Sequence, residues 1–162
     1  MTMKPIAEIV GKLLVAKQQT IACAESCTGG LLTSMLTDVA GSSAYVMGSV
    51  VSYTNSIKER LVGVNPATIA AHTEISAETA GEMAEGIRQL IGTDLGVGIT
   101  GLAGPGGGTK VRPVGLVYIA VTGDKGTKVR ENRFQGNRVE IKQQSAEMAL
   151  QMIVEYVSGG SF

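Results

Sequence analysis

Short apolar runs that alternate with amphipathic segments constrain the fold of this chain most strongly. The runs are of strand length and are bounded by glycine, proline and polar residues, whereas the segments between them repeat apolar residues at helical spacing. Buried strands interspersed with helices predict a three-layer α/β/α domain with a mixed, mostly parallel sheet. We expect strands at 20–24, 46–53 (buried), 95–100, 114–122 and 128–134 (an edge), and helices at 5–18, 28–38, 56–62, 65–71, 76–91 and 138–157.

The composition indicates a globular protein and gives no reason to expect a nucleic-acid-binding or membrane protein. With 162 residues, of which 44% are hydrophobic and 17% charged, we expect one globular domain over residues 1–162. Lysine plus arginine and aspartate plus glutamate number 14 each, so the charge gives no reason to expect nucleic acid or a membrane as partner. Two cysteines and a single histidine do not predict a metal site. No apolar run approaches a membrane span and no leader is evident, so we expect a cytoplasmic protein.

The segment 22–30, with the sequence A-C-A-E-S-C-T-G-G, joins the first strand to the second helix. A helix start carries unpaired N–H groups and partial positive charge, so a hydroxyl there lies beside a ready site for an anion or oxyanion. Ser26 is therefore a candidate nucleophile, although Ser26 and Thr28 are equally suited to cap the helix. Cys27 is the rival nucleophile, but a small buried cysteine is the commoner case.

A nucleophilic serine needs a base. The sole histidine, His72, lies in the polar stretch A-H-T-E and is expected at the surface. A lysine serves as base if burial lowers its pKa. Lys58 follows the second strand and is on the same sheet edge as Ser26, although a lysine on a short surface helix is ordinarily solvated.

Two further segments are candidates for binding an anion. The loop 101–113 is rich in glycine, and consecutive backbone N–H groups in such a loop can cradle a phosphate, although a flexible surface loop is the alternative. Residues 96–101 match G-x-G-x-x-G by letter, but no helix follows them. Arg138 begins the last helix, where its charge opposes the helix dipole. Such a placement often has a reason, such as a phosphate or carboxylate partner, although an ordinary surface arginine is the default interpretation.

Several blocks of sequence together resemble the CinA C-terminal domain family, and the resemblance covers residues 6–157. The blocks, in order, are A-E-S-C-T-G-G (24–30), A-G-S-S (40–43), S-Y-T-N-x-x-K (52–58), G-I-T-G-L-A-G-P-x-G-G (98–108) and F-x-G-N-R (134–138).

The resemblance implies a nicotinamide-nucleotide amidase that hydrolyses nicotinamide mononucleotide to nicotinate mononucleotide and ammonia, in pyridine-nucleotide salvage. It assigns Ser26 as nucleophile and Lys58 as base, with Tyr53 and Thr100 supporting them, and Arg138 as the ligand of the phosphate. It implies no metal or cofactor, and a homo-oligomer of two or more subunits. The residues expected to contact substrate are Glu25, Thr28, Gly29, Gly30, Gly101, Gly104, Gly106, Gly107 and Arg138.

Two further expectations follow from the assigned roles. The pKa of Lys58 should lie well below its usual value because of burial, whereas a nearby Glu25 would raise it. The alternative function is a non-catalytic module that binds a pyridine nucleotide in the same pocket, and the presence of both Ser26 and Lys58 favours the enzyme.

Overall fold

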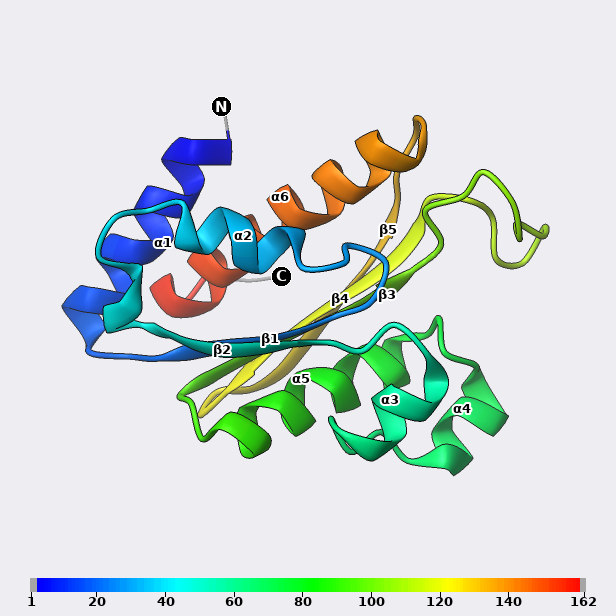
Figure 1. The fold of residues 1–162 in the computed structure, drawn as a ribbon, viewed down its shortest axis with the longest axis horizontal. Helices are drawn as coiled ribbons and strands as arrows, with labels where there is room; N and C mark the ends of the chain where they lie inside the picture. Colours follow the sequence, from blue (N-terminus) through cyan, green and yellow to red (C-terminus); the bar gives the residue numbers. More distant parts are fainter. Residues whose placement is uncertain (1–2, 161–162) are drawn as a thin grey trace.

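The computed structural model describes residues 3–160 and forms a five-stranded sheet with helices on both faces (Figure 1). In chain order, the elements are α1 (Met3–Lys17), β1 (Ile21–Glu25), α2 (Leu31–Thr37), the 3-10 helix η1 (Ser42–Ala44), β2 (Val46–Val51), α3 (Asn55–Arg60), α4 (Pro66–His72), α5 (Ala77–Ile91), β3 (Leu95–Gly101), β4 (Leu116–Gly123), β5 (Gly126–Arg133) and α6 (Arg138–Ser158).

The strand order is β2-β1-β3-β4-β5. β1 is parallel to both β2 and β3, and β4 is antiparallel to both β3 and β5. β1, β2, β3 and β5 therefore run in one direction, which confirms the predicted mixed, mostly parallel sheet. Because Glu25 pairs with Val51 on one side and Ile99 on the other, the carboxyl ends of β1, β2 and β3 lie side by side, at the right of Figure 1. Ligands of open α/β sheets gather at such an edge.

Helices α1, α2 and α6 cover one face of the sheet, and α3, α4 and α5 cover the other (Figure 1). The larger hydrophobic core lies under α1, α2 and α6 and includes Leu14, Leu36, Ile99 and Ile153. A smaller cluster lies on the opposite face and joins β1 to α5 and to the segment that follows α3. The predicted three layers are thus confirmed.

Glycines in β3 allow α5 to pack directly on the sheet. A Cβ atom at Gly98 would lie 2.4 Å from the backbone oxygen of Ala80, and one at Gly96 would lie 2.2 Å from that of Ala84. The glycines of the G-x-G-x-x-G pattern at 96–101 lie within strand β3 and allow a helix to pack on it. This agrees with the expectation that the pattern is not a nucleotide-binding motif.

Some predicted boundaries were wrong. The strand expected to be buried at 46–53 is the edge strand β2, which ends at Val51 and leaves Met47 and Val51 half-exposed. Its valines show an apolar strand but do not distinguish an edge from a central position. The strand expected from 114 begins at Leu116, because Gly115 has a φ of +95° and closes the preceding loop. The edge strand expected at 128–134 is confirmed as β5.

Candidate active site

The turn after β1 is organised by the carboxylate of Glu25, which is fully buried. Its Oε1 accepts hydrogen bonds from the Thr28 hydroxyl (2.6 Å) and the Leu32 N–H (3.0 Å), and its Oε2 accepts from the N–H (2.9 Å) and the hydroxyl (2.6 Å) of Thr33. Both oxygens are thus engaged within the protein. Glu25 satisfies unpaired N–H groups at the start of α2 and places its charge at the positive end of that helix.

This arrangement corrects the expected helix start and the expected cap. Helix α2 begins at Leu31 rather than at 28, and its N-cap residue is Gly30, which has a φ of +103° and no side chain to serve as cap. Thr28 donates its hydroxyl to Glu25 instead, and the Ser26 hydroxyl lies beside Lys58. The capping interpretation of Ser26 and Thr28 was therefore wrong.

Ser26 and Lys58 meet at the edge of the sheet. Nζ of Lys58 lies 3.0 Å from Oγ of Ser26, and it also donates to the backbone oxygens of Ser52 (3.0 Å) and Tyr53 (3.2 Å). The Lys58 side chain is only 1% exposed. The general expectation that a lysine on a short surface helix is solvated fails here, because α3 turns this residue inward against the ends of β1 and β2.

The surroundings of Lys58 suit a neutral amine. Burial lowers the pKa of Lys58, and the charge of Glu74 opposes this shift. Glu25, expected to raise this pKa, is not among the groups that act on it. A neutral amine has two N–H donors and one lone pair. The two backbone oxygens can take the donors, which leaves the lone pair for the Ser26 hydroxyl. A charged ammonium would donate to the same three oxygens, so the proton can move between Oγ and Nζ without rearranging the pocket.

Thr100 and Tyr53 lie in different surroundings. The Thr100 side chain is buried, and its hydroxyl donates to the backbone oxygen of Glu74 (2.6 Å), so it fixes the segment between α4 and α5. Tyr53 contributes its backbone oxygen to Lys58, whereas its side chain is 56% exposed and its hydroxyl accepts from Arg138 (3.0 Å). Both residues hold neighbouring segments around the Ser26–Lys58 pair.

Arg138 joins the last helix to the glycine-rich loop. Its guanidinium donates to the backbone oxygen of Gly104 (2.6 Å) as well as to Tyr53. Gly104 therefore lies on the part of the loop that contacts the start of α6, whereas Gly101 is the last residue of β3. Gly106 and Gly107 are exposed in the loop that follows β3, and within residues 3–160 neither forms a hydrogen bond with Ser26 or Lys58.

The turn that follows Ser26 has free hydrogen-bond donors. Within residues 3–160, the backbone N–H groups of Thr28 and Gly30 donate to no protein acceptor, whereas that of Gly29 donates to the Ser26 oxygen (3.0 Å). Gly29 and Gly30 both have positive φ values, which L-residues with side chains rarely adopt. The turn therefore offers N–H donors close to the candidate nucleophile, as an oxyanion site requires.

Cys27 does not fit the rival role of nucleophile. It is buried, and this burial raises the pKa of its thiol to about 12. The thiol therefore stays protonated near neutral pH, and a thiol is a poor nucleophile compared with a thiolate.

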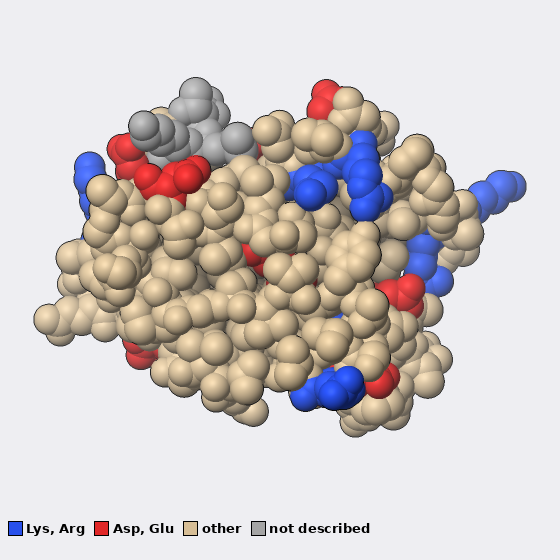
Figure 2. Space-filling view, viewed as in Figure 1, with Lys and Arg blue, Asp and Glu red and all other residues tan. Residues whose placement is uncertain are grey.

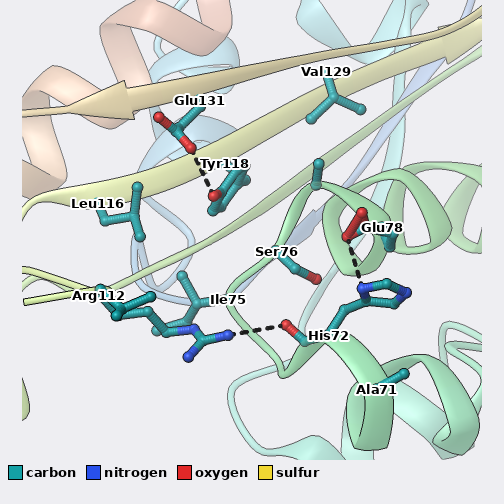
Figure 3. A pocket seen from close by; sticks show the side chains of 12 residues that line it. Ala71, His72, Ile75, Ser76, Glu78, Arg112, Leu116, Tyr118, Val129 and Glu131 are labelled. Carbon is teal, nitrogen blue, oxygen red and sulfur yellow. Dashed lines mark hydrogen bonds and ion pairs between the residues drawn. The ribbon is translucent and has the colours of Figure 1, made fainter. Parts of the chain in front are cut away.

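His72 is exposed at the end of α4, as expected, and lies 3.7 Å from Glu78. It lines a cavity of about 510 Å³ between the 71–78 segment, β4 and β5 (Figure 3). Arg112 extends into this cavity and donates to the backbone oxygen of His72 (3.4 Å). None of the predicted site residues lines the cavity, so it is separate from the Ser26–Lys58 pair.

The described residues contain no group of three or more histidine, cysteine or acidic side chains that could hold a metal ion. Among the helices between residues 3 and 160, none combines the length and apolar character needed to cross a membrane.

Sequence reasoning missed three residues near the pair. Glu74 acts on the charge of Lys58, Lys142 lies over the turn at Gly29, and Ser52 accepts from Lys58 through its backbone. The Ser52 hydroxyl is buried without a hydrogen-bond partner among residues 3–160. The S-Y-T-N-x-x-K block contains Ser52 and could have pointed to it as a site residue. The positions of Glu74 and Lys142 depend on tertiary packing and carry no such signal in the sequence.

Comparisons with known proteins identify relatives of the chain. Residues 3–157 match the family model described as the CinA C-terminal domain. A CinA-like protein of Koribacter versatilis is 49% identical over 148 residues, which cover 91% of this chain and 36% of the relative. A CinA-like protein of Cyanothece sp. is 50% identical over 82% of this chain and 32% of its own. The chain thus spans about a third of the length of the curated relatives that it matches.

Solved structures show the same fold. The competence/damage inducible protein CihA of Agrobacterium tumefaciens superposes with a TM-score of 0.93 at 35% identity, covering 96% of this chain and 95% of that one. A CinA superfamily protein of Klebsiella pneumoniae superposes with a TM-score of 0.94 at 29% identity, covering 98% and 99% of the two chains.

Proposed function

The chain belongs to the CinA C-terminal domain family, and from this membership together with the Ser26–Lys58 pair we propose that it is an amidase. Its substrate is nicotinamide mononucleotide, and its products are nicotinate mononucleotide and ammonia. The observation that carries the proposal is the buried Lys58 amine, whose pKa is lowered by burial, 3.0 Å from the Ser26 hydroxyl. A hydroxyl within hydrogen-bond reach of a neutral amine is the arrangement of a serine activated by a lysine base.

The acylation step uses this pair. Ser26 Oγ attacks the carbonyl carbon of the carboxamide, and its proton passes to Nζ of Lys58. The negative charge that develops on the carbonyl oxygen is stabilised by N–H groups of the turn, for which Thr28 and Gly30 have free donors. The tetrahedral intermediate then breaks its C–N bond, and Lys58 returns the proton to the departing nitrogen, so that ammonia leaves and an ester on Ser26 remains.

Deacylation repeats the same proton transfers with water. Lys58, neutral again, takes a proton from a water molecule that attacks the ester, and it returns that proton to Ser26 Oγ as the ester breaks. The second proton of the water remains on the new carboxyl group and is released to solvent as the product ionises to nicotinate mononucleotide. The burial of Lys58 supports this cycle because it keeps the charged form of the amine unfavourable between the steps.

The test is ammonia release from nicotinamide mononucleotide by the purified protein, by Ser26→Ala and by Lys58→Ala. We expect release by the wild type only, and nucleotide binding by all three proteins. Lys128, an exposed residue of β5, supplies the matched control, and Lys128→Ala should release ammonia at the wild-type rate. Wild-type release in the Ser26→Ala protein would contradict the proposal. Binding without release in the wild type would indicate a pyridine-nucleotide-binding module instead.

A further inference from the structure

Lys142 lies one helical turn beyond Arg138 on α6, and the two residues therefore share a face of that helix. Its Nζ is 3.7 Å from the position that a Cβ atom on Gly29 would occupy. The ammonium group thus lies directly over the turn that carries Ser26. Figure 2 shows lysine and arginine side chains gathered on this face of the molecule, over the first half of α6.

The charge of Lys142 acts on the turn but not on the base. The charge of Lys142 lowers the pKa of the Cys27 thiol, so its ammonium group is close to this residue. Lys142 is not among the groups that shift the pKa of Lys58. Lys142 is therefore not needed to account for the lowered pKa of Lys58.

Lys142 is a half-buried cation without a counter-charge. In the part of the chain between residues 3 and 160, no carboxylate lies within ion-pair distance of its ammonium, and no protein acceptor receives a hydrogen bond from it. Withdrawing a charge from water is unfavourable unless a partner replaces the lost solvation. Gly29 has no side chain to cover this ammonium group, since a Cβ atom there would lie 3.7 Å from Nζ.

We propose that Lys142 and Arg138 together bind the phosphate of the substrate, and that Lys142 makes the site selective for phosphomonoesters. The inference rests on the proposed amidase function and deepens it, because it names the residue that separates the nucleotide from the riboside. Arg138 already donates to Gly104 and Tyr53, so its guanidinium is fixed in place with part of its fork still free.

The charge of the ligand explains the selectivity. A phosphomonoester carries close to two negative charges near neutral pH and offers three acceptor oxygens, so it can engage two cations at once. A riboside offers neither charge nor these acceptors, and the bridging phosphates of a dinucleotide carry one charge each. A pair of cations one helical turn apart therefore favours the mononucleotide over both.

Binding and turnover together test the proposal. By calorimetry, Lys142→Gln should weaken the binding of nicotinate mononucleotide about tenfold or more, the loss of one charge-assisted contact, and leave nicotinate riboside unchanged. In turnover, it should raise KM for nicotinamide mononucleotide, with kcat nearly unchanged. Lys142→Arg keeps the charge and should retain most of the affinity, and Lys128→Gln serves as the matched surface control.

The outcomes separate this proposal from the amidase function. Undiminished binding of the mononucleotide by Lys142→Gln, or an equal loss for nucleotide and riboside, would overturn the phosphate role even if ammonia release is intact. If Lys142→Gln loses affinity for the nucleotide only, and the wild type releases no ammonia, the phosphate role would be supported and the amidase function would be contradicted. Thermal unfolding of each variant checks that Lys142→Gln remains folded.

Discussion

Nζ of Lys58 lies 3.0 Å from Oγ of Ser26, although 32 positions separate the two residues in the chain. The contact depends on the parallel pairing of β1 and β2, which brings the ends of both strands to one edge. Ser26 follows β1 directly, and α3 then turns Lys58 back toward it after β2. The pair thus depends on the sheet topology. Substitution of either residue should abolish ammonia release and leave the fold intact.

Alkylation and substitution of Cys27 should leave the amidase active. The thiol is buried and its pKa is raised to about 12, so iodoacetamide should react slowly with the folded protein, and Cys27→Ala should keep kcat within about threefold of the wild type. Removing the small buried side chain should cost about 1 kcal/mol of stability. The measurement is ammonia release before and after alkylation. Complete inactivation of the wild type by alkylation, together with an inactive Cys27→Ala, would assign the nucleophile to Cys27.

The pH dependence of kcat/KM should report Lys58. Because the base must be neutral, activity should rise with pH as the ammonium loses its proton, with a midpoint below the ordinary lysine value of 10.5. The charge of Glu74 raises the pKa of Lys58, so Glu74→Gln should move this midpoint to lower pH and make the enzyme relatively more active on the acid side.

Glu78→Gln is the matched control for this experiment, because Glu78 pairs with His72 in the neighbouring cavity and does not act on Lys58. Its pH profile should superpose on that of the wild type. An unchanged midpoint in Glu74→Gln would mean that Glu74 does not tune the base, and a midpoint at or above 10.5 in the wild type would contradict a neutral lysine in the folded protein.

Glu25→Gln should destabilise the protein by about 2–4 kcal/mol, because the buried carboxylate accepts four hydrogen bonds and an amide nitrogen cannot accept any. The start of α2 would lose its cap, and the turn at Ser26 would lose its shape, so kcat should fall as well. Urea unfolding followed by circular dichroism gives the change in free energy. Glu8→Gln, on an exposed position of α1, should be neutral, and an equally small effect of Glu25→Gln would exclude the capping role.

The sequence predicts the layers of this fold better than the details of its site. Periodicity and glycine junctions identify every strand and most helices, because each of these signals is local. The inward orientation of Lys58 could not be predicted in this way, since it depends on how a six-residue helix docks at the sheet edge. The hydrogen bonds of Glu25 could not be predicted either. Their donors lie up to eight residues further along the chain, and they reach Glu25 only because of the shape of the turn between them.

Gly98→Ala should destabilise the protein, because the new methyl group would lie 2.4 Å from the backbone oxygen of Ala80 and 2.7 Å from the backbone nitrogen of Ala84. Backbone atoms of α5 cannot turn aside as a flexible side chain can, so the helix must move away from β3, at a cost of about 1–3 kcal/mol. Gly106→Ala is the matched control, since a Cβ atom there would have no neighbour within 4 Å. Differential scanning calorimetry should show a Tm lowered by several degrees for Gly98→Ala and an unchanged Tm for Gly106→Ala. Equal Tm values for the two variants would show that α5 does not pack on the strand through Gly98.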